Sequence, residues 1–206
     1  MTHAARRALA FAAVTTAALT VTTPAALACA CCAETAHRYA RVEGLKEKHT
    51  GELGQLRFAK AARLVAGNRE ADARLRGIKD AGENYELAVT QEDGQMTLAF
   101  RDNKGRPGTL GFRLPYTITV FEVDPRGAET DTGMGPTLYK EWRIGVSPSG
   151  DGLFKAAVTR NTKATLVLHG RGNACTSFEQ FTDWTLLVTG PANTFTMYGK
   201  LDSAKR

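Results

Sequence analysis

From Asn84 onward, the sequence is a series of short runs of β-branched and aromatic residues separated by turn residues. Nine runs can be counted: 85–90, 96–100, 109–114, 116–123, 138–146, 153–159, 165–169, 184–189 and 195–201. This regular spacing is typical of antiparallel all-β domains. We therefore expect a mainly β fold, a single antiparallel β-barrel or β-sandwich of about nine strands. Both architectures satisfy the strand count.

The residues between the runs have turn compositions. Asp93-Gly94 predicts a hairpin, because glycine tolerates the positive φ that such a turn requires. The longest expected loop is 127–136, which holds three glycines and two acidic residues. No linker-length segment divides the series, which indicates one domain.

The part of the chain before Asn84 has a less regular pattern. Residues 34–50 are polar and predict a weak helix or an extended leader that ends at Gly51 and Gly54. Residues 56–64 suit either a strand or an alanine-rich helix, and 69–78 suit a short helix. We therefore expect a short, partly helical, cysteine-rich leader over 29–55 and a β domain over 56–206.

The first 28 residues have the organisation of an export signal. Arg6 and Arg7 precede an acid-free stretch rich in Ala, Val, Leu and Thr, and Ala26-Leu27-Ala28 forms a small-x-small cleavage pattern. Cleavage after Ala28 leaves 178 of the 206 residues. The expected location is the periplasm or the extracellular side of the cell envelope.

Two variants of this signal stay open. Cys29 follows the expected cut as in a lipoprotein, although the leucine of a lipobox is displaced to Leu27. Acyl chains on Cys29 would then attach the protein to a membrane. Arg6-Arg7 also allows a twin-arginine signal, but the neighbouring residues lack the rest of that motif.

The charge of the mature chain bears on its partners. Arg6 and Arg7 are the only charged residues of the signal, so cleavage lowers the formal net charge from +6 to +4. No Lys/Arg block or aromatic-interleaved basic motif occurs, which argues against nucleic acid as a partner. An anionic envelope polymer, lipid head groups or a small ligand fits better, and the alternative is a soluble surface with a slight positive excess.

The four cysteines predict a disulfide. Cys29, Cys31 and Cys32 cluster at the mature N-terminus, and Cys175 lies far along the chain. Cys31 and Cys32 cannot easily pair with each other, because neighbouring Cα atoms are about 3.8 Å apart and disulfides usually span about 4.4–6.8 Å. In an oxidising compartment we expect Cys175 to pair with Cys31 or Cys32.

A soft-metal site is the first functional alternative. Cys29, Cys31 and Cys32 form a C-x-C-C cluster whose thiolates can converge on Cu or Zn. Additional ligands would come from His37, His49, His169, Met134 and Met197. No second C-x-x-C or H-x₃-H element supports this site, and a disulfide would compete for the same sulfurs.

A cysteine enzyme is the second alternative. His169 ends a predicted strand six residues before Cys175, so it could activate that thiol as in the exported L,D-transpeptidases. Residues 172–177 lack the His-Gly and Arg that flank the cysteine in those enzymes. The carboxylate pairs Glu122/Asp124 and Glu179/Asp183 are expected to be solvated, and Gly150-Asp151-Gly152 and Gly170-Arg171-Gly172 are expected to be turns.

Five segments carry a family resemblance: 28–34 (ACACCAE), 83–87 (ENYEL), 138–143 (LYKEWR), 170–175 (GRGNAC) and 181–184 (FTDW). Together they resemble a family of exported bacterial proteins of uncharacterised function. The resemblance implies export and an envelope location, and it transfers no catalytic or binding residue. Because the mature sequence carries no catalytic triad, no paired acids in a motif context and no cofactor fingerprint, we expect a binding or structural role rather than an enzyme.

Overall fold

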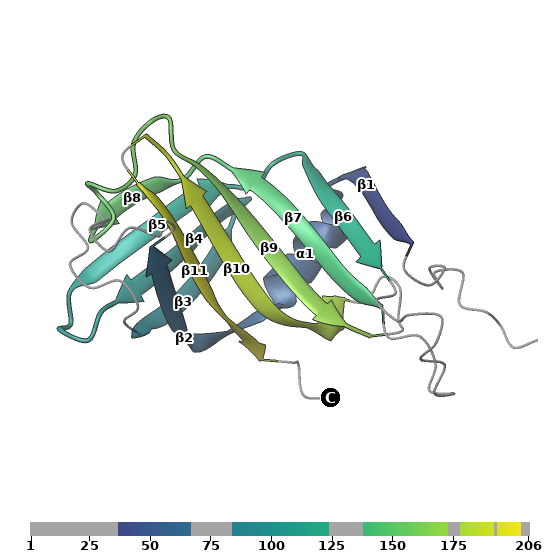
Figure 1. Cartoon of the computed structure of the whole chain (residues 1–206), viewed down its shortest axis with the longest axis horizontal. Coiled ribbons are helices and arrows are strands. Elements are labelled where there is room, and N and C mark those ends of the chain that lie inside the picture. The colour runs from purple at the N-terminus through teal and green to yellow at the C-terminus, as the bar shows by residue number, and fades with distance from the viewer. Residues whose placement is uncertain (1–36, 67–83, 124–137, 173–177, 192, 203–206) are drawn as a thin grey trace, which may run out of the picture.

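The computed structural model describes residues 37–66, 84–123, 138–172, 178–191 and 193–202 (Figure 1). These residues form eleven strands, one α-helix and one 3-10 helix, in the order β1 (Arg38–Gly44), α1 (Glu47–Gln55), β2 (Arg57–Ala66), β3 (Asn84–Glu92), β4 (Gln95–Arg101), β5 (Pro107–Arg113), β6 (Thr117–Val123), β7 (Tyr139–Val146), β8 (Ser149–Gly152), β9 (Lys163–Arg171), η1 (Phe178–Gln180), β10 (Phe181–Thr189) and β11 (Thr194–Asp202). The expected mainly β fold is confirmed.

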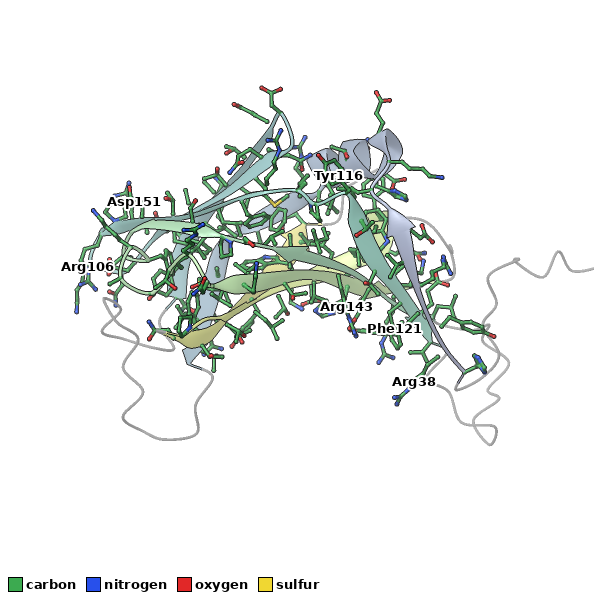
Figure 2. All side chains as sticks on the ribbon, turned by 90° about the horizontal axis from the view of Figure 1, so that it is seen from above. Arg38, Arg106, Tyr116, Phe121, Arg143 and Asp151 are labelled. Carbon is green, nitrogen blue, oxygen red and sulfur yellow. The ribbon has the colours of Figure 1, made fainter. Side chains whose placement is uncertain are left out.

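All eleven strands belong to one antiparallel sheet. Their order across the sheet is β1-β6-β7-β9-β10-β11-β2-β3-β4-β5-β8. The sheet curves around its core but is not closed, so β1 and β8 are its two edges (Figures 1 and 2). Eight of the nine expected runs form strands, and β1, β2 and β8 bring the count to eleven.

The core lies on one face of this curved sheet, which we call the core face. Along β4, β5, β6 and β9, buried residues alternate with more exposed ones, as the period of two in a strand requires. The largest fully buried side chains are Trp184, Phe112, Phe154, Phe195, Leu53, Leu64, Met96, Leu98, Leu110, Ile118, Leu138 and Ile144. We call the opposite side of the sheet the outer face.

The segment before the β domain is more structured than a leader. β1 pairs with β6, and α1 follows it with Leu53 buried in the core. Gly51 and Gly54 lie inside α1 and do not end it, so that expectation was wrong. The ambiguous stretch 56–64 is part of β2, and the helix expected over 69–78 falls outside the described residues.

Three other local predictions need correction. Residues 153–159 form turns rather than a strand, although Phe154 and Ala157 are fully buried. Gly150-Asp151-Gly152 belongs to β8, and Gly170-Arg171 ends β9, so neither segment is a simple turn. The hairpin at Asp93-Gly94 is confirmed, with φ values of 49° and 72°.

Candidate functional site

The candidate site is a cluster of aromatic and charged side chains on the outer face, formed by Phe121 of β6, Tyr139, Glu141 and Arg143 of β7, and His169 of β9. We call it the outer-face cluster. The strand register places Glu141 between Phe121 and His169, each of which is its direct cross-strand partner. Tyr139 and Arg143 lie two residues to either side of Glu141, on the same face. Figure 2 shows Phe121 and Arg143 projecting from the same side of the sheet.

Glu141 holds this cluster together. Its residue is only 9% exposed, which is unusual for a charged side chain. One carboxylate oxygen accepts a hydrogen bond from the Tyr139 hydroxyl, and the other accepts one from Arg143 Nε at 2.5 Å. Two neighbouring side chains are therefore fixed by one buried carboxylate, and charge-assisted bonds of this kind are strong.

The rings pack around this anchor. The Arg143 guanidinium lies 5.3 Å from the centroid of Phe121, within the range of a cation–π interaction. The Tyr139 ring is 6.3 Å from Phe121 and 6.0 Å from His169, measured between centroids. The cluster therefore presents two aromatic rings and a guanidinium in fixed positions.

Tyr139 stays a neutral hydroxyl in this environment. Burial raises its pKa, and the hydrogen bond to Glu141 and the negative charge of Glu141 raise it further. The positive charges of Arg143 and Arg171 act in the opposite direction but do not outweigh these effects. The pKa of Tyr139 therefore lies well above its ordinary value, and the hydroxyl remains a hydrogen-bond donor.

Two further arginines flank the cluster. Arg38 of β1 and Arg171 of β9 share one register row of the outer face with Tyr139, Arg38 through Val123 and Arg171 directly. Both are exposed. The cluster and its two flanking arginines thus carry three positive charges and one negative charge. The negative charge is that of Glu141, which is hydrogen-bonded to Tyr139 and Arg143.

On the other side of His169, the charges are balanced. Asp183 is the cross-strand partner of both His169 and Lys200. It pairs with the Lys200 ammonium and accepts a hydrogen bond from Thr182 Oγ1 at 2.7 Å. Burial alone would raise the pKa of Asp183, but these two partners outweigh it and the pKa lies below its ordinary value. Because the negative charge of Asp183 is balanced by Lys200, it does not cancel the positive charge of the arginines.

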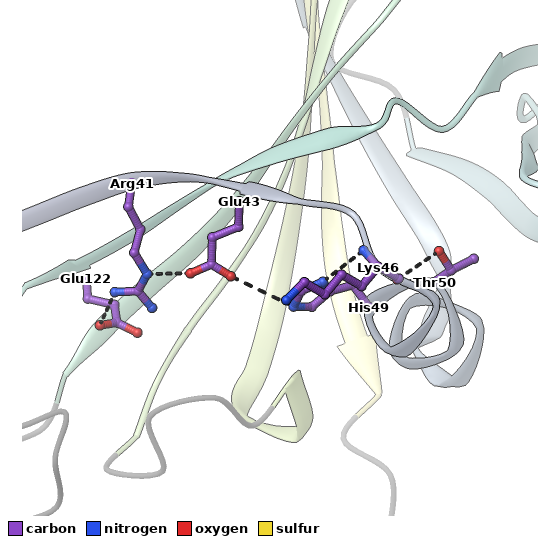
Figure 3. Close-up of polar contacts among 6 residues, drawn as sticks. All are labelled: Arg41, Glu43, Lys46, His49, Thr50 and Glu122. Atoms are coloured by element: carbon purple, nitrogen blue, oxygen red, sulfur yellow. Dashed lines mark hydrogen bonds and ion pairs between the residues drawn. The ribbon is translucent and has the colours of Figure 1, made fainter.

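A second group of charges lies on the core face below β1 (Figure 3). Arg41 pairs with Glu43 and, at 3.6 Å, with Glu122; Glu43 is 4.0 Å from His49 Nε2. His49 also packs edge-on against Trp142 with centroids 5.3 Å apart. These contacts attach β1 and α1 to the sheet, so we assign this group a structural role.

Glu122 is buried, contrary to the expectation from the sequence. It was predicted to be a solvated carboxylate, but it is 6% exposed on the core face. Its cross-strand partner Lys140 is 4% exposed and donates to Gln180 Oε1 at 2.6 Å. Asp124 and the side chain of Glu179, the other members of the carboxylate pairs with Glu122 and Asp183, lie outside the described part.

Most of the cysteine chemistry predicted from the sequence falls on residues that the structure does not describe. Cys29, Cys31, Cys32 and Cys175 all lie there, as does Met134. The disulfide, the Cu or Zn site and the cysteine enzyme therefore stay predictions. Within the described ranges, no group of three or more His, Cys, Asp or Glu could hold a metal ion. Of the histidines and methionines named as candidate ligands, His169 lies in the outer-face cluster, His49 packs against Trp142, and Met197 is buried in the core.

The other residues of the outer-face cluster were missed in the sequence. A partial signal for them exists on β7, where Glu141 and Arg143 alternate with the apolar Trp142 and Ile144, although Lys140 interrupts the pattern before Glu141. Such alternation identifies an outward-facing polar row. It does not show which residues of β6 and β9 lie beside that row, since this depends on the strand register.

Comparison with known proteins identifies no relative from which a function could be transferred. No family model, no curated protein and no solved structure matches the chain. Among the described residues, no helix has the length and apolar character needed to cross a membrane.

Proposed function

We propose that this chain is an exported cell-envelope protein that acts by binding an anionic envelope polymer through the outer-face cluster. The observation that carries the proposal is that Arg143 lies over the ring of Phe121, while Arg38 and Arg171 share the register row of Tyr139 on the same face. Guanidinium groups match phosphate and carboxylate in geometry and can bind them through two parallel hydrogen bonds.

The fixed geometry of Arg143 supports this role. Its Nε is bonded to Glu141 and its plane rests near Phe121, while 48% of the side chain remains exposed. The ligand therefore does not have to order a mobile arginine on binding. Preorganisation of this kind reduces the entropic cost of association.

Export is supported by the signal-like residues 1–28, by the cysteines, and by the resemblance to exported bacterial proteins.

The predicted disulfide is compatible with the positions at which β1 begins and β9 ends. Arg38 and Arg171 are separated by β6 and β7, three inter-strand spacings or about 14 Å. Cys32 precedes Arg38 by six residues and Cys175 follows Arg171 by four. At about 3.3 Å per extended residue, these segments are long enough to meet.

A direct test compares polymers of different charge. The mature protein is titrated with poly(glycerol phosphate), with polygalacturonate and with neutral dextran, and binding is measured by calorimetry. We expect binding to one or both anionic polymers and none to dextran. Failure to bind either anionic polymer at low salt would overturn the proposal.

Matched variants separate a specific site from general charge attraction. Arg143→Gln should weaken binding about tenfold, whereas Arg160→Gln, the same change at an exposed arginine outside the cluster, should change it less than about twofold. Equal losses in both variants would show that only net charge matters.

Glu141→Gln gives the sharpest contrast. It raises the positive charge of the outer face by one, so a mechanism based on charge alone predicts tighter binding. We expect weaker binding, because Arg143 and Tyr139 lose the carboxylate that positions them. Circular dichroism of each variant checks that the fold is retained.

A further inference from the structure

β1 is the longer of the two edges of the sheet. It has seven residues, against four for β8, and two of those four are glycines. One side of β1 pairs with β6 over its whole length, from Arg38 opposite Val123 to Gly44 opposite Thr117. No described strand pairs with its other side. An edge strand of this length offers unpaired backbone groups to another chain.

The register shows which backbone groups are unpaired. Leu45 N–H donates to Tyr116 O at 2.7 Å and continues the β1–β6 register by one residue. In an antiparallel pair, hydrogen-bonded positions alternate with positions that are not hydrogen-bonded to that neighbour. Arg41 and Glu43 therefore bond to β6, and the N–H and C=O groups of Ala40 and Val42 point away from the sheet.

We propose that β1 pairs with β1 of a second copy of this chain, antiparallel, with the two-fold axis at Val42. Val42 N–H of each copy then donates to Val42 C=O of the other. Gly44 N–H of each copy donates to Ala40 C=O of the other. The four bonds extend the sheet continuously from one copy into the next, a known mode of strand addition.

The charges of β1 select this register. With the axis at Val42, Arg41 of each copy lies opposite Glu43 of the other, on the core face. An axis at Arg41 would place two arginines opposite each other, and an axis at Glu43 would do the same with two glutamates. Like charges directly opposite in a sheet are destabilising and opposite charges are favourable. The strand is therefore complementary to itself at one register.

The side chain of Val42 fits the same arrangement. It lies on the outer face and is 70% exposed, the most exposed valine among the described residues. At the two-fold axis it would meet its own copy, and pairs of β-branched residues stabilise neighbouring strands. An otherwise unexplained exposed apolar side chain is then covered by the second copy.

Two substitutions at Val42 test the pairing, with the full mature protein and sedimentation velocity over the micromolar range. Val42→Lys places two ammonium groups together at the axis. Val42→Pro removes the outward N–H, and proline is tolerated on an edge where that group does not bond to the neighbouring strand. We expect a dimer for the wild type and an increase of about tenfold or more in the dissociation constant for both variants.

Val65→Lys is the matched control, because Val65 is a 45% exposed valine on the outer face of β2, inside the sheet. It should leave the dimer unchanged. A wild-type protein that stays monomeric throughout the range would overturn the proposal. So would a dimer that survives both Val42 variants, or one that Val65→Lys disrupts equally. None of these results depends on the identity of the polymer that the outer-face cluster binds.

Discussion

Asp102 is a single buried carboxylate that organises the connection between β4 and β5. Its side chain is 1% exposed and accepts hydrogen bonds from the N–H groups of Lys104 at 3.0 Å and Arg106 at 2.8 Å. It also pairs with the Arg106 guanidinium at 2.6 Å. Burial alone would raise the pKa of Asp102, but these hydrogen bonds and the charge of Arg106 outweigh it. The pKa of Asp102 therefore lies below its ordinary value.

Replacement of this residue should lower stability in a pH-dependent way. We expect Asp102→Asn to reduce the free energy of unfolding by about 2 kcal/mol at neutral pH. A depressed pKa stabilises the fold above the unfolded-state value of about 3.9. That contribution disappears as the pH falls through the lower pKa of the folded state, so the difference between variant and wild type should shrink in acid. Urea unfolding at several pH values measures it.

Asp93→Asn is the matched control for Asp102→Asn. Asp93 is also a hairpin aspartate, but it is exposed and its φ of 49° suits asparagine. We expect a change within about 0.5 kcal/mol. Equal urea midpoints for the two variants would contradict the role assigned to Asp102.

At the scale of elements, β9 and η1 come together where β9 carries a glycine. A Cβ added to Gly170 would lie 1.9 Å from the carbonyl oxygen of Gln180 and 2.9 Å from Cα of Phe181. Real side chains do not approach backbone atoms this closely, so only glycine fits. The close approach allows β9 and β10 to stay paired beside η1.

Gly170→Ala should therefore force β9 and η1 apart. We expect a loss of about 1–3 kcal/mol in the free energy of unfolding, typical of overpacking. Gly145→Ala on the neighbouring strand β7 is the control, because nothing lies within 4 Å of its added Cβ. A Gly170→Ala variant as stable as Gly145→Ala would show that the two elements can separate without cost.

The elements differ in how far the sequence predicts them. The hairpin at Asp93-Gly94 and strands such as β4 and β9 follow from turn chemistry and a period of two. Residues 153–159 do not form a strand, because the buried pair Phe154 and Ala157 is spaced by three residues with Lys155 and Ala156 exposed between them. β1 was missed because its core-face positions hold Arg41 and Glu43 instead of apolar residues.

The outer-face cluster is less predictable for a different reason. Its members come from three strands, and two of these, β7 and β9, are neighbours in the sheet but not consecutive in the sequence. Only the register brings Phe121, Glu141 and His169 into one row. The sequence singled out His169 for a reaction with Cys175, and the structure instead shows it beside Tyr139 and Glu141.

For the whole molecule, the bonding state of the cysteines distinguishes a disulfide-linked domain from a metal-binding one. Non-reducing peptide mapping of protein from its native compartment should find Cys175 linked to Cys31 or Cys32. Alkylation before reduction should leave Cys175 unmodified. Stoichiometric copper or zinc together with four free thiols would favour the metal site, and a free, reactive Cys175 would favour the cysteine enzyme.

The intact mass of the same sample tests export. Cleavage after Ala28 predicts a chain that begins at Cys29. A diacylglyceryl mass on Cys29 would show a lipid-anchored protein, still in the envelope. Intact protein retaining Met1 in the cell would contradict export.

The central claim is that the outer-face cluster binds an anionic polymer, and its location can be measured directly. Nuclear magnetic resonance spectra recorded while poly(glycerol phosphate) or polygalacturonate is added report which side chains meet the polymer. We predict that the Nε–H signal of Arg143 and the ring signals of Tyr139 and His169 shift first and saturate together. Shifts centred on other surfaces, such as the outer face of β3, β4 and β5, with these three signals unchanged, would contradict the account.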